Sequence, residues 1–559
     1  MITRHFRSKI ALLLPIALMG LTGCAVEDPT GADLQPVDCS APITSQGVTY
    51  TGARDGAACA WRGIPFAEAP VGELRFQYAR PTGLKGDFDA THYGTTCLQG
   101  AGFSVESYRT HQSFGEDCLN LNIWTPGVGP EAQLRAKLPV MVWIYGGGFA
   151  SGSGATELYN GEPFTQHDVV VVTLNYRLGA LGWLAITDAT DSDGHTLEGN
   201  YGLSDQIQAL TWVRNNIAAF GGNPDNVTIF GESAGAYSVC ALMASPHAAG
   251  LYHRAIMESG ACLMAGAEKH AAYSRQWISD VGCPATAPES LECLRALDPQ
   301  WLREHASWPL FEIDAPVVGG AWLPQQPYEA LQGSGRSVPL LVGFNHDEVK
   351  LLGLANQNLM NKGSEPWTTT WANIESAVGT QAAEKLKAAY PRSEYPTPKD
   401  LLLQGATDVL FSCAAREAAR TGSEPAYQYR FRITPDSFFL EPLAGTFHAS
   451  EIPYVFGNKD LLRLIFMRDQ PLEDALNLSA QMQTYWSNFA KTGDPNGGDL
   501  PHWEPMDKDQ FLMELTTPLG SSQGEFSSRC DVWDAVLPRE LNTRFYEFGP
   551  KLIGTTSIF

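Results

Sequence analysis

The chain has little positive charge. It carries 38 lysine and arginine residues against 61 aspartate and glutamate residues, for a formal net charge of −23. Proteins that bind nucleic acid cluster lysine and arginine against the phosphates, so we expect no nucleic-acid partner. The excess of acid predicts solubility more directly than it predicts attraction of cationic substrates, because salt screens surface charge.

Metal-binding patterns and long apolar runs are also missing. No Cys-x-x-Cys pair and no cysteine–histidine cluster has the spacing of metal ligands, so we predict no metal and no cofactor. The apolar stretch Ile10 to Leu18 is too short to be read as a membrane-spanning helix. We find no internal repeat, low-complexity tract or linker, and we therefore expect one large domain over residues 42–559.

The N-terminus has the pattern of a secretory signal, because basic residues precede that short apolar stretch. The Leu-Thr-Gly-Cys sequence ending at Cys24 resembles a bacterial lipobox, in which cleavage leaves an acylated cysteine. We predict a lipoprotein signal peptide at 1–23, a flexible tether at 24–41, and an exported protein anchored to the cell envelope through Cys24 or otherwise secreted. The alternative is an ordinary cleaved signal with a chance cysteine.

Export allows the cysteines to oxidise. Spacing makes two disulfides plausible among the cysteines that follow Cys24, namely Cys97 with Cys118 and Cys283 with Cys293. Cys39 with Cys59 and Cys413 with Cys530 are further candidates. Cys240 and Cys262 are then left, and we interpret them as buried thiols.

Apolar runs of strand length alternate with helical patterns along most of the chain. Near-continuous apolar strands separated by helices predict an α/β fold with a large, mainly parallel sheet covered on both faces. We expect a short N-terminal hairpin of Val48–Tyr50 and Ala58–Trp61, and helical insertions near 265–335 and 350–420 that form a lid or gorge wall over the strand ends. The expected core strands are Leu119–Trp124, Leu138–Tyr145, Val169–Asn175, Val227–Phe230, Ala255–Glu258, Leu340–Gly343 and Ala426–Phe431; the expected helices include Gly202–Phe220 and Ala234–Met243.

The most informative motif is Gly-Glu-Ser-Ala-Gly at residues 231–235. A lone G-x-S-x-G is a weak signal in a chain with 54 glycines, and the alternative is an ordinary turn. Here it lies between an expected strand and an expected helix, which is the context of a nucleophile elbow. The two glycines permit a turn too tight for a Cβ, so the Ser233 hydroxyl is predicted to be presented at a helix N-terminus.

A serine nucleophile needs a base, and the base needs an acid to orient it. The order serine, acid, histidine is typical of α/β-hydrolases. Downstream of Ser233, the expected strand from Leu340 leads into Asp347 and Glu348, which can supply the acid; a solvated surface pair is the alternative. His448 lies in an expected loop after residue 431 and is the candidate base, and His346 is its rival.

An oxyanion intermediate needs backbone N–H donors aimed at it in advance. The three glycines at 146–148 follow an expected strand and allow the backbone to approach a substrate closely. A phosphate-binding loop is the competing interpretation, but no Lys-Ser or Lys-Thr follows and the G-x-G-x-x-G pattern is incomplete.

Several longer motifs together resemble the type-B carboxylesterase and cholinesterase family of α/β-hydrolases, from about residue 42 to residue 545. Glu-Asp-Cys-Leu-Asn-Leu-Asn-Ile-Trp at 116–124 resembles a family signature, although Asn120 stands where tyrosine or threonine is usual. Phe-Gly-Glu-Ser-Ala-Gly-Ala at 230–236 is similar to the nucleophile signature of the family. Asn-Tyr-Gly-Leu-Ser-Asp-Gln at 200–206 and Phe-Gly-Gly-Asn-Pro at 220–224 are further landmarks.

The resemblance implies Ser233 as nucleophile, Glu348 rather than Asp347 as triad acid, and His448 as general base. It implies an oxyanion hole made by the N–H groups of Gly147, Gly148 and Ala234, and a role for Glu232 in the electrostatics of the substrate gorge. It also implies the disulfides Cys97–Cys118 and Cys283–Cys293, with Cys413–Cys530 similar to a third found in cholinesterases.

Substrate preference is less well defined by the resemblance. Cholinesterases bind a quaternary ammonium group against a tryptophan in the first disulfide loop, and the loop between Cys97 and Cys118 has none. Tyr108 lies near the corresponding spacing, and Leu310 and Glu312 lie near the aromatic acyl-pocket positions. We therefore expect a carboxylesterase that hydrolyses small-molecule esters through an acyl-serine, with no cofactor.

Three other functions share parts of this pattern. A choline ester hydrolase or a lipase would use the same triad, and only a lipase would gain activity at an oil–water interface. A non-catalytic adhesion module of the family would be expected to lack a triad member. A surface-anchored binding lipoprotein would leave the nucleophile, base, acid and glycine loop unexplained.

Overall fold

The computed structural model describes residues 38–99, 113–126, 137–286, 288–305, 314–333, 336–355, 357–433, 445–466, 469–506, 511–524 and 527–537. These residues form an 11-stranded sheet in the order β20-β19-β18-β17-β14-β13-β9-β10-β8-β4-β3. Smaller sheets flank it, among them a three-stranded one of β1 (Ile43–Ser45), β2 (Val48–Thr51) and β5 (Gly86–Asp89).

The centre of the large sheet is parallel and its two edges are antiparallel. Neighbouring strands run parallel from β10 through β9, β13, β14, β17 and β18 to β19, while β8, β4 and β3 on one side and β20 on the other are antiparallel. The expected core strands are present as β8 (Asn120–Thr125), β9 (Leu138–Ile144), β10 (Val170–Leu174), β13 (Gly222–Glu232), β14 (Arg254–Glu258), β17 (Leu340–Asn345) and β18 (Ala426–Phe431). The remaining edge strands are β3 (Ala53–Asp55), β4 (Ala58–Pro65), β19 (Phe511–Leu515) and β20 (Gly520–Gln523).

The expected N-terminal hairpin is wrong in its pairing. β4 pairs with β3 in the large sheet, whereas β2 pairs with β1 and β5 in the three-stranded sheet. The reason is the tight turn at Ala57, which joins β3 directly to β4 and leaves β2 on a different sheet.

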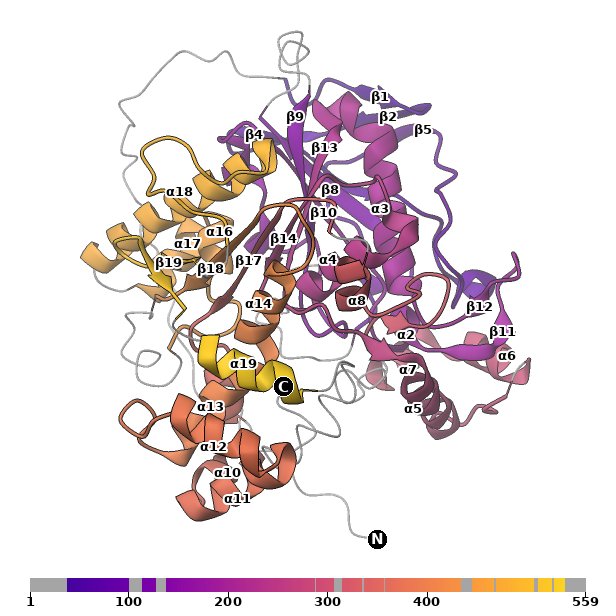
Figure 1. Ribbon diagram of the computed structural model, residues 1–559. Helices are drawn as coiled ribbons and strands as arrows, with labels where there is room; N and C mark the ends of the chain where they lie inside the picture. The colour runs from indigo at the N-terminus through magenta and orange to yellow at the C-terminus, as the bar shows by residue number, and fades with distance from the viewer. Residues whose placement is uncertain are drawn as a thin grey trace, which may run out of the picture. The chain divides into compact units, whose positions relative to one another are not determined.

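Helices cover both faces of the large sheet, as apolar parallel strands require. Figure 1 shows α16 (Ile452–Val455), α17 (Lys459–Ile465) and α18 (Asp469–Thr492) on one side, and α3 (Tyr201–Asn216), α4 (Ala234–Ala244) and α8 (Pro327–Gly333) on the other. The expected insertions are helical. The first comprises α5 (Ala267–Asp280), α6 (Glu289–Ala296), α7 (Pro299–His305) and α8, and the second comprises α9 (Lys350–Ala355), α10 (Gln357–Gly363), α11 (Trp367–Val378), α12 (Thr380–Ala389), α13 (Pro398–Thr407) and α14 (Cys413–Ala419). In the part of the chain described by the structure, no helix is both long enough and apolar enough to cross a membrane.

The described residues contain five disulfides: Cys39–Cys59, Cys97–Cys118, Cys240–Cys262, Cys283–Cys293 and Cys413–Cys530. The interpretation of Cys240 and Cys262 as buried thiols is wrong, since they are bonded to each other. Cys240 lies in α4 and Cys262 follows β14, and α4 packs on that strand, so the two cysteines meet although 22 residues separate them in sequence.

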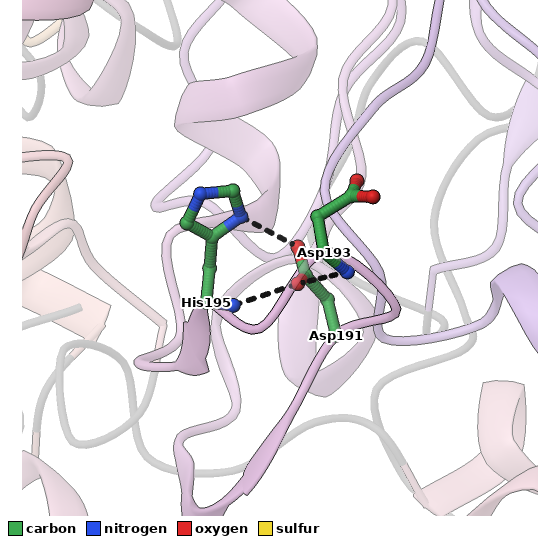
Figure 2. A group of neighbouring side chains, drawn as sticks. All are labelled: Asp191, Asp193 and His195. Atoms are coloured by element: carbon green, nitrogen blue, oxygen red, sulfur yellow. Dashed lines mark hydrogen bonds and ion pairs between the residues drawn. The ribbon is translucent and has the colours of Figure 1, made fainter.

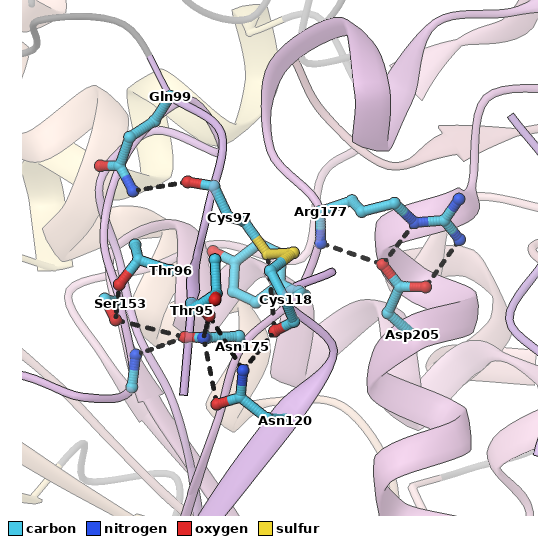
Figure 3. Close-up of a disulfide and its surroundings, with 12 residues drawn as sticks. Thr95, Thr96, Cys97, Gln99, Cys118, Asn120, Ser153, Asn175, Arg177 and Asp205 are labelled. Carbon is cyan, nitrogen blue, oxygen red and sulfur yellow. Dashed lines mark hydrogen bonds and ion pairs between the residues drawn. A yellow bond between two sulfur atoms is a disulfide. The ribbon is translucent and has the colours of Figure 1, made fainter. Parts of the chain in front are cut away.

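A buried polar network surrounds the Cys97–Cys118 disulfide (Figure 3). The Asn120 amide donates to the carbonyls of Thr95 at 2.9 Å and Cys118 at 3.0 Å. A Cβ on Gly94 would lie 2.6 Å from the Asn120 side chain, so the local backbone is packed directly on this amide. Asn120 therefore replaces the usual tyrosine or threonine of the motif with a side chain that satisfies buried carbonyls in the sheet.

Candidate active site

Ser233 has the strained backbone of a nucleophile elbow. It lies between β13 and α4 with φ 54° and ψ −124°, a region that side chains with a Cβ rarely adopt. Its N–H donates to the carbonyl of Glu258 at the end of β14, at 2.9 Å. A Cβ on Gly235 would lie 1.9 Å from the Ile144 carbonyl oxygen, and one on Gly231 would lie 2.5 Å from the same atom. The turn therefore depends on both glycines of the motif.

Glu348 and His448 form a close pair. Glu348 follows β17 and is fully buried, and its Oε1 accepts the backbone N–H of Asn345 at 2.7 Å. Its Oε2 lies 2.7 Å from Nδ1 of His448. The backbone N–H of His448 also donates to the Glu348 carbonyl, at 3.2 Å. This arrangement orients the imidazole so that Nε2 is its outward nitrogen, as a general base requires.

The two competing residues beside Glu348 are directed elsewhere. Asp347 Oδ2 accepts the backbone N–H of Thr446 at 2.9 Å and lies 3.3 Å from Nδ1 of His346. Burial opposes ionisation of Asp347, but His346 and the Thr446 N–H lower its pKa to about 2. Asp347 and His346 thus pair with each other, and it is Glu348 that contacts His448.

Glu232 contacts the other side of the imidazole. Nε2 of His448 lies 3.1 Å from Oε1 of Glu232, and both side chains are largely buried. Burial alone would lower the pKa of His448, but the Glu232 and Glu348 carboxylates raise it to about 9. The positive imidazolium form of His448 is therefore stabilised in this site.

The glycine loop packs against Glu232 and Ser233. A Cβ on Gly146 would lie 2.7 Å from Oε2 of Glu232 and 3.0 Å from the Ser233 Cβ. Gly147 and Gly148 both have positive φ, at 104° and 63°, and the Gly147 carbonyl accepts the N–H groups of Ala150 and Ser151. Ala234 begins α4, so its N–H belongs to the helix N-terminus beside Ser233. The structure thus places Gly147, Gly148 and Ala234 on segments that meet at Ser233.

Two further buried carboxylates, Glu258 and Glu451, lie close to this group and were not among the predicted site residues. Glu258 accepts the indole N–H of Trp486 at 2.8 Å, and burial with nearby Glu451 raises its pKa well above the usual range. Glu451 contacts Ser259 at 3.5 Å, and burial with nearby Glu348 raises its pKa to about 7. Glu451 is three residues after His448, which is the only signal that could have found it.

The remaining predicted residues lie outside the described chain. Tyr108, Leu310 and Glu312 belong to segments that the structure does not describe, as do Cys24, the signal at 1–23 and most of the tether.

One group of possible metal ligands occurs among the described residues, and it lies in the turn between β11 (Ile186–Thr190) and β12 (Thr196–Leu197). Figure 2 shows Asp191, Asp193 and His195 gathered there. Asp191 Oδ1 accepts the backbone N–H groups of Asp193 at 2.9 Å and His195 at 2.8 Å, and Oδ2 lies 3.1 Å from His195 Nδ1. These bonds build a hairpin turn, and we assign the cluster no metal.

The family follows from comparison with known proteins. Residues 44–533 match the Carboxylesterase family. The chain belongs to this family. It is 36% identical over 464 residues to para-nitrobenzyl esterase of Bacillus subtilis, covering 81% of this chain and 90% of the relative. It is 34% identical over 510 residues to carboxylesterase 5A of Mus musculus, covering 85% of this chain and 84% of the relative.

Solved structures of carboxylesterase-family members confirm the α/β-hydrolase fold. A thermophilic PNB esterase superposes with a TM-score of 0.75 at 31% sequence identity, over 88% of this chain and 99% of the other. The chain is a carboxylic ester hydrolase, as its family and relatives show.

Proposed function

We propose that this carboxylesterase hydrolyses esters through Ser233 as nucleophile, His448 as general base and Glu348 as the acid that orients the base. The observation that carries the proposal is the 2.7 Å contact between Glu348 Oε2 and His448 Nδ1, with Ser233 at the turn between β13 and α4. A buried carboxylate on Nδ1 fixes the tautomer and stabilises the imidazolium that forms during the reaction.

In the proposed cycle, neutral His448 takes the Ser233 proton on Nε2 as the hydroxyl oxygen attacks the ester carbonyl. The carbonyl π electrons move to oxygen and form a tetrahedral oxyanion. On collapse the bond to the alcohol oxygen breaks, and His448 returns its proton to that oxygen. Water then attacks the acyl-serine by the same route and releases the acid.

The glycine loop and the start of α4 would stabilise the oxyanion. The N–H groups of Gly147, Gly148 and Ala234 are the proposed donors, and positive φ at both glycines supports this role because it turns the peptide groups without a side chain in the way. Loss of a single donor of this kind typically costs about 10²–10³ in kcat.

We propose a broad carboxylesterase that accepts a range of small-molecule esters, with choline ester hydrolysis as the alternative. Glu232 is the proposed substrate-site residue that the structure describes, and its carboxylate stands beside His448. The proposed contributions of Tyr108, Leu310 and Glu312 rest on their positions in the family pattern alone.

The test compares wild type with Ser233→Ala on p-nitrophenyl esters of increasing acyl length and on acetylthiocholine. We expect hydrolysis of short acyl esters that is lost in Ser233→Ala and kept in Ser192→Ala, a change of an exposed serine. A folded wild type that hydrolyses none of these esters would overturn the proposal for this substrate class.

We further propose that the protein is exported and anchored through an acylated Cys24. Its disulfides support an oxidising compartment. The expected result is a lipid-modified protein in the membrane fraction and a soluble one after Cys24→Ala; an unmodified Cys24 would contradict the anchor.

A further inference from the structure

The ring of His448 packs against a phenylalanine that the proposed mechanism does not use. The Phe411 and His448 ring centroids lie 4.9 Å apart with an interplanar angle of 45°, and Phe411 is buried. Glu348 and Glu232 fix the two nitrogens of the imidazole, whereas Phe411 contacts the ring itself. The tilt of the ring therefore depends on where Phe411 lies.

Phe411 lies on an unusual piece of backbone. Residues Asp408–Ser412 form a π-helical turn between α13 (Pro398–Thr407) and α14 (Cys413–Ala419). One extra residue in a helix rotates the following side chains by about 100° around the axis. Such insertions are rare and occur frequently at functional sites. Here the turn directs Phe411 to His448.

Asp408 anchors this turn to the C-terminal helix α19 (Ser527–Val536). The fully buried Asp408 accepts Arg529 Nε at 2.7 Å and the Tyr390 hydroxyl at 2.6 Å on Oδ2. Its Oδ1 accepts the Gln404 amide at 3.0 Å. The Trp533 indole N–H donates in turn to the Tyr390 hydroxyl at 2.7 Å. Arg529 of α19 thus contacts Asp408, the first residue of the π-helical turn, directly. Trp533 of α19 contacts Asp408 indirectly, through Tyr390.

Two other links join α19 to the same helical segment, but they attach at residues that follow Phe411 in the chain. The Cys413–Cys530 disulfide follows the π-helical turn directly. Arg416, on α14, contacts Asp531 at 2.9 Å and Asp534 at 2.6 Å on α19. Arg416 therefore docks α19 on α14, whereas Arg529 docks it on Asp408, the residue that begins the turn.

We infer that α19 positions the imidazole of His448, through the pairing of Arg529 with Asp408 and the contact of Phe411 with the ring. Asp408, Phe411 and Arg529 are then positioning residues in this carboxylesterase. The inference rests on the proposed role of His448 as general base. Loss of Arg529 releases the π-helical turn, Phe411 shifts, and the imidazole departs from the geometry set by Glu348 and Glu232.

The test uses the full chain with three variants: Arg529→Gln, Phe411→Leu and, as matched control, Arg416→Gln. Steady-state kinetics on p-nitrophenyl acetate give kcat and KM over pH. Histidine-selective ¹⁵N labelling gives the titration of His448, whose resonance among the 12 histidines is identified by its loss in His448→Gln. Thermal unfolding shows whether each variant is folded.

We expect Arg529→Gln and Phe411→Leu to lower kcat about 10-fold with KM changed less than about twofold, because misplacement of a catalytic group by an ångström or less is costly. The His448 titration should move to lower pH, since the ring leaves the carboxylates of Glu232, Glu348 and Glu451 that raise its pKa. Arg416→Gln should lower the unfolding temperature and leave both readouts unchanged.

Unaltered kcat and His448 titration in folded Arg529→Gln would overturn the inference whatever Phe411→Leu shows, and unaltered values in Phe411→Leu would overturn it as well. Equal changes in Arg416→Gln would also overturn it, because they would show only loosened docking of α19. If Arg529→Gln does not fold, Arg529→Lys replaces it, because lysine keeps the charge beside Asp408 but has no Nε–H to donate to Asp408 Oδ2. If wild type hydrolyses no ester, the proposed function fails, and the His448 titration in the three variants still decides the positioning.

Discussion

Nε2 of His448 lies 3.1 Å from Oε1 of Glu232, the residue immediately before Ser233 in the chain. This nitrogen is also the one that must accept the Ser233 proton in the proposed cycle. Glu232 therefore competes with Ser233 for Nε2 whenever His448 is protonated. The raised pKa of His448, about 9, is one consequence of this contact.

The first prediction concerns pH. Since the base must be neutral, kcat/KM should rise with pH and its midpoint should lie well above the usual histidine value of about 6.5. Glu232→Gln removes a negative charge that favours imidazolium, so the midpoint should fall by about one pH unit or more. The pH–rate profile checks this. An unchanged midpoint in Glu232→Gln, or an equal shift in the control Glu329→Gln at an exposed position of α8, would contradict it.

The second prediction separates the two adjacent acids. Glu348→Gln should lower kcat about 10³–10⁴-fold, because the amide cannot stabilise the imidazolium and favours the wrong tautomer. Asp347→Asn should lower it less than about tenfold, since Asp347 contacts His346 and Thr446 instead of His448. Kinetics on a p-nitrophenyl ester decide the matter, and equal losses in the two variants would show that the acid is misassigned.

The third prediction concerns the elbow. Gly235→Ala should destabilise the fold by about 3 kcal/mol or more, because its Cβ would lie 1.9 Å from a backbone oxygen that cannot move freely. Gly83→Ala is the control, since its Cβ would meet nothing within 4 Å. Chemical unfolding of both variants measures the difference. A Gly235→Ala protein as stable as Gly83→Ala would show that the elbow backbone relaxes.

The fourth prediction concerns stability against pH. Glu451 and His448 both bind protons more tightly when folded, with pKa values of about 7 and about 9. Their contribution to stability is therefore complete below their unfolded pKa values and is lost as pH rises through the folded ones. The unfolding temperature of the wild type should fall from pH 5 to pH 9. In Glu451→Gln it should fall less than in the wild type over the part of this range below pH 7. A slope that is the same in wild type and Glu451→Gln would rule out Glu451 as its source.

The alternation of apolar runs and helices was sufficient to predict the fold, because parallel strands buried on both faces have a distinctive composition. The partners of β2 were not predictable, because the partner of a strand here is decided by the turns that connect the strands, and the composition of each strand does not reveal it. The bond between Cys240 and Cys262 was missed for a similar reason: it follows from α4 lying on β14.

Some residues of the site could likewise be selected from the sequence, and others could not. Ser233 could be selected from a local motif, and Glu348 and His448 from the family pattern; their catalytic roles stay predictions. Adjacent side chains of Asp347 and Glu348 point to different partners because of the turn after β17. Phe411 could not be selected at all, since a π-helical turn has no sequence signature and its contact with His448 is purely tertiary.

The Cys413–Cys530 disulfide closes a segment of 117 residues, and its second cysteine is made long after Ser233, Glu348 and His448 have left the ribosome. A growing chain can thus contain all three residues while the π-helical turn that contacts His448 is not yet bound by α19. We expect newly made protein to become fully competent only after Arg529 has been made and α19 has docked on Asp408. Catalytic competence would then lag behind synthesis of Ser233, Glu348 and His448, because the helix that positions the histidine is made after all three.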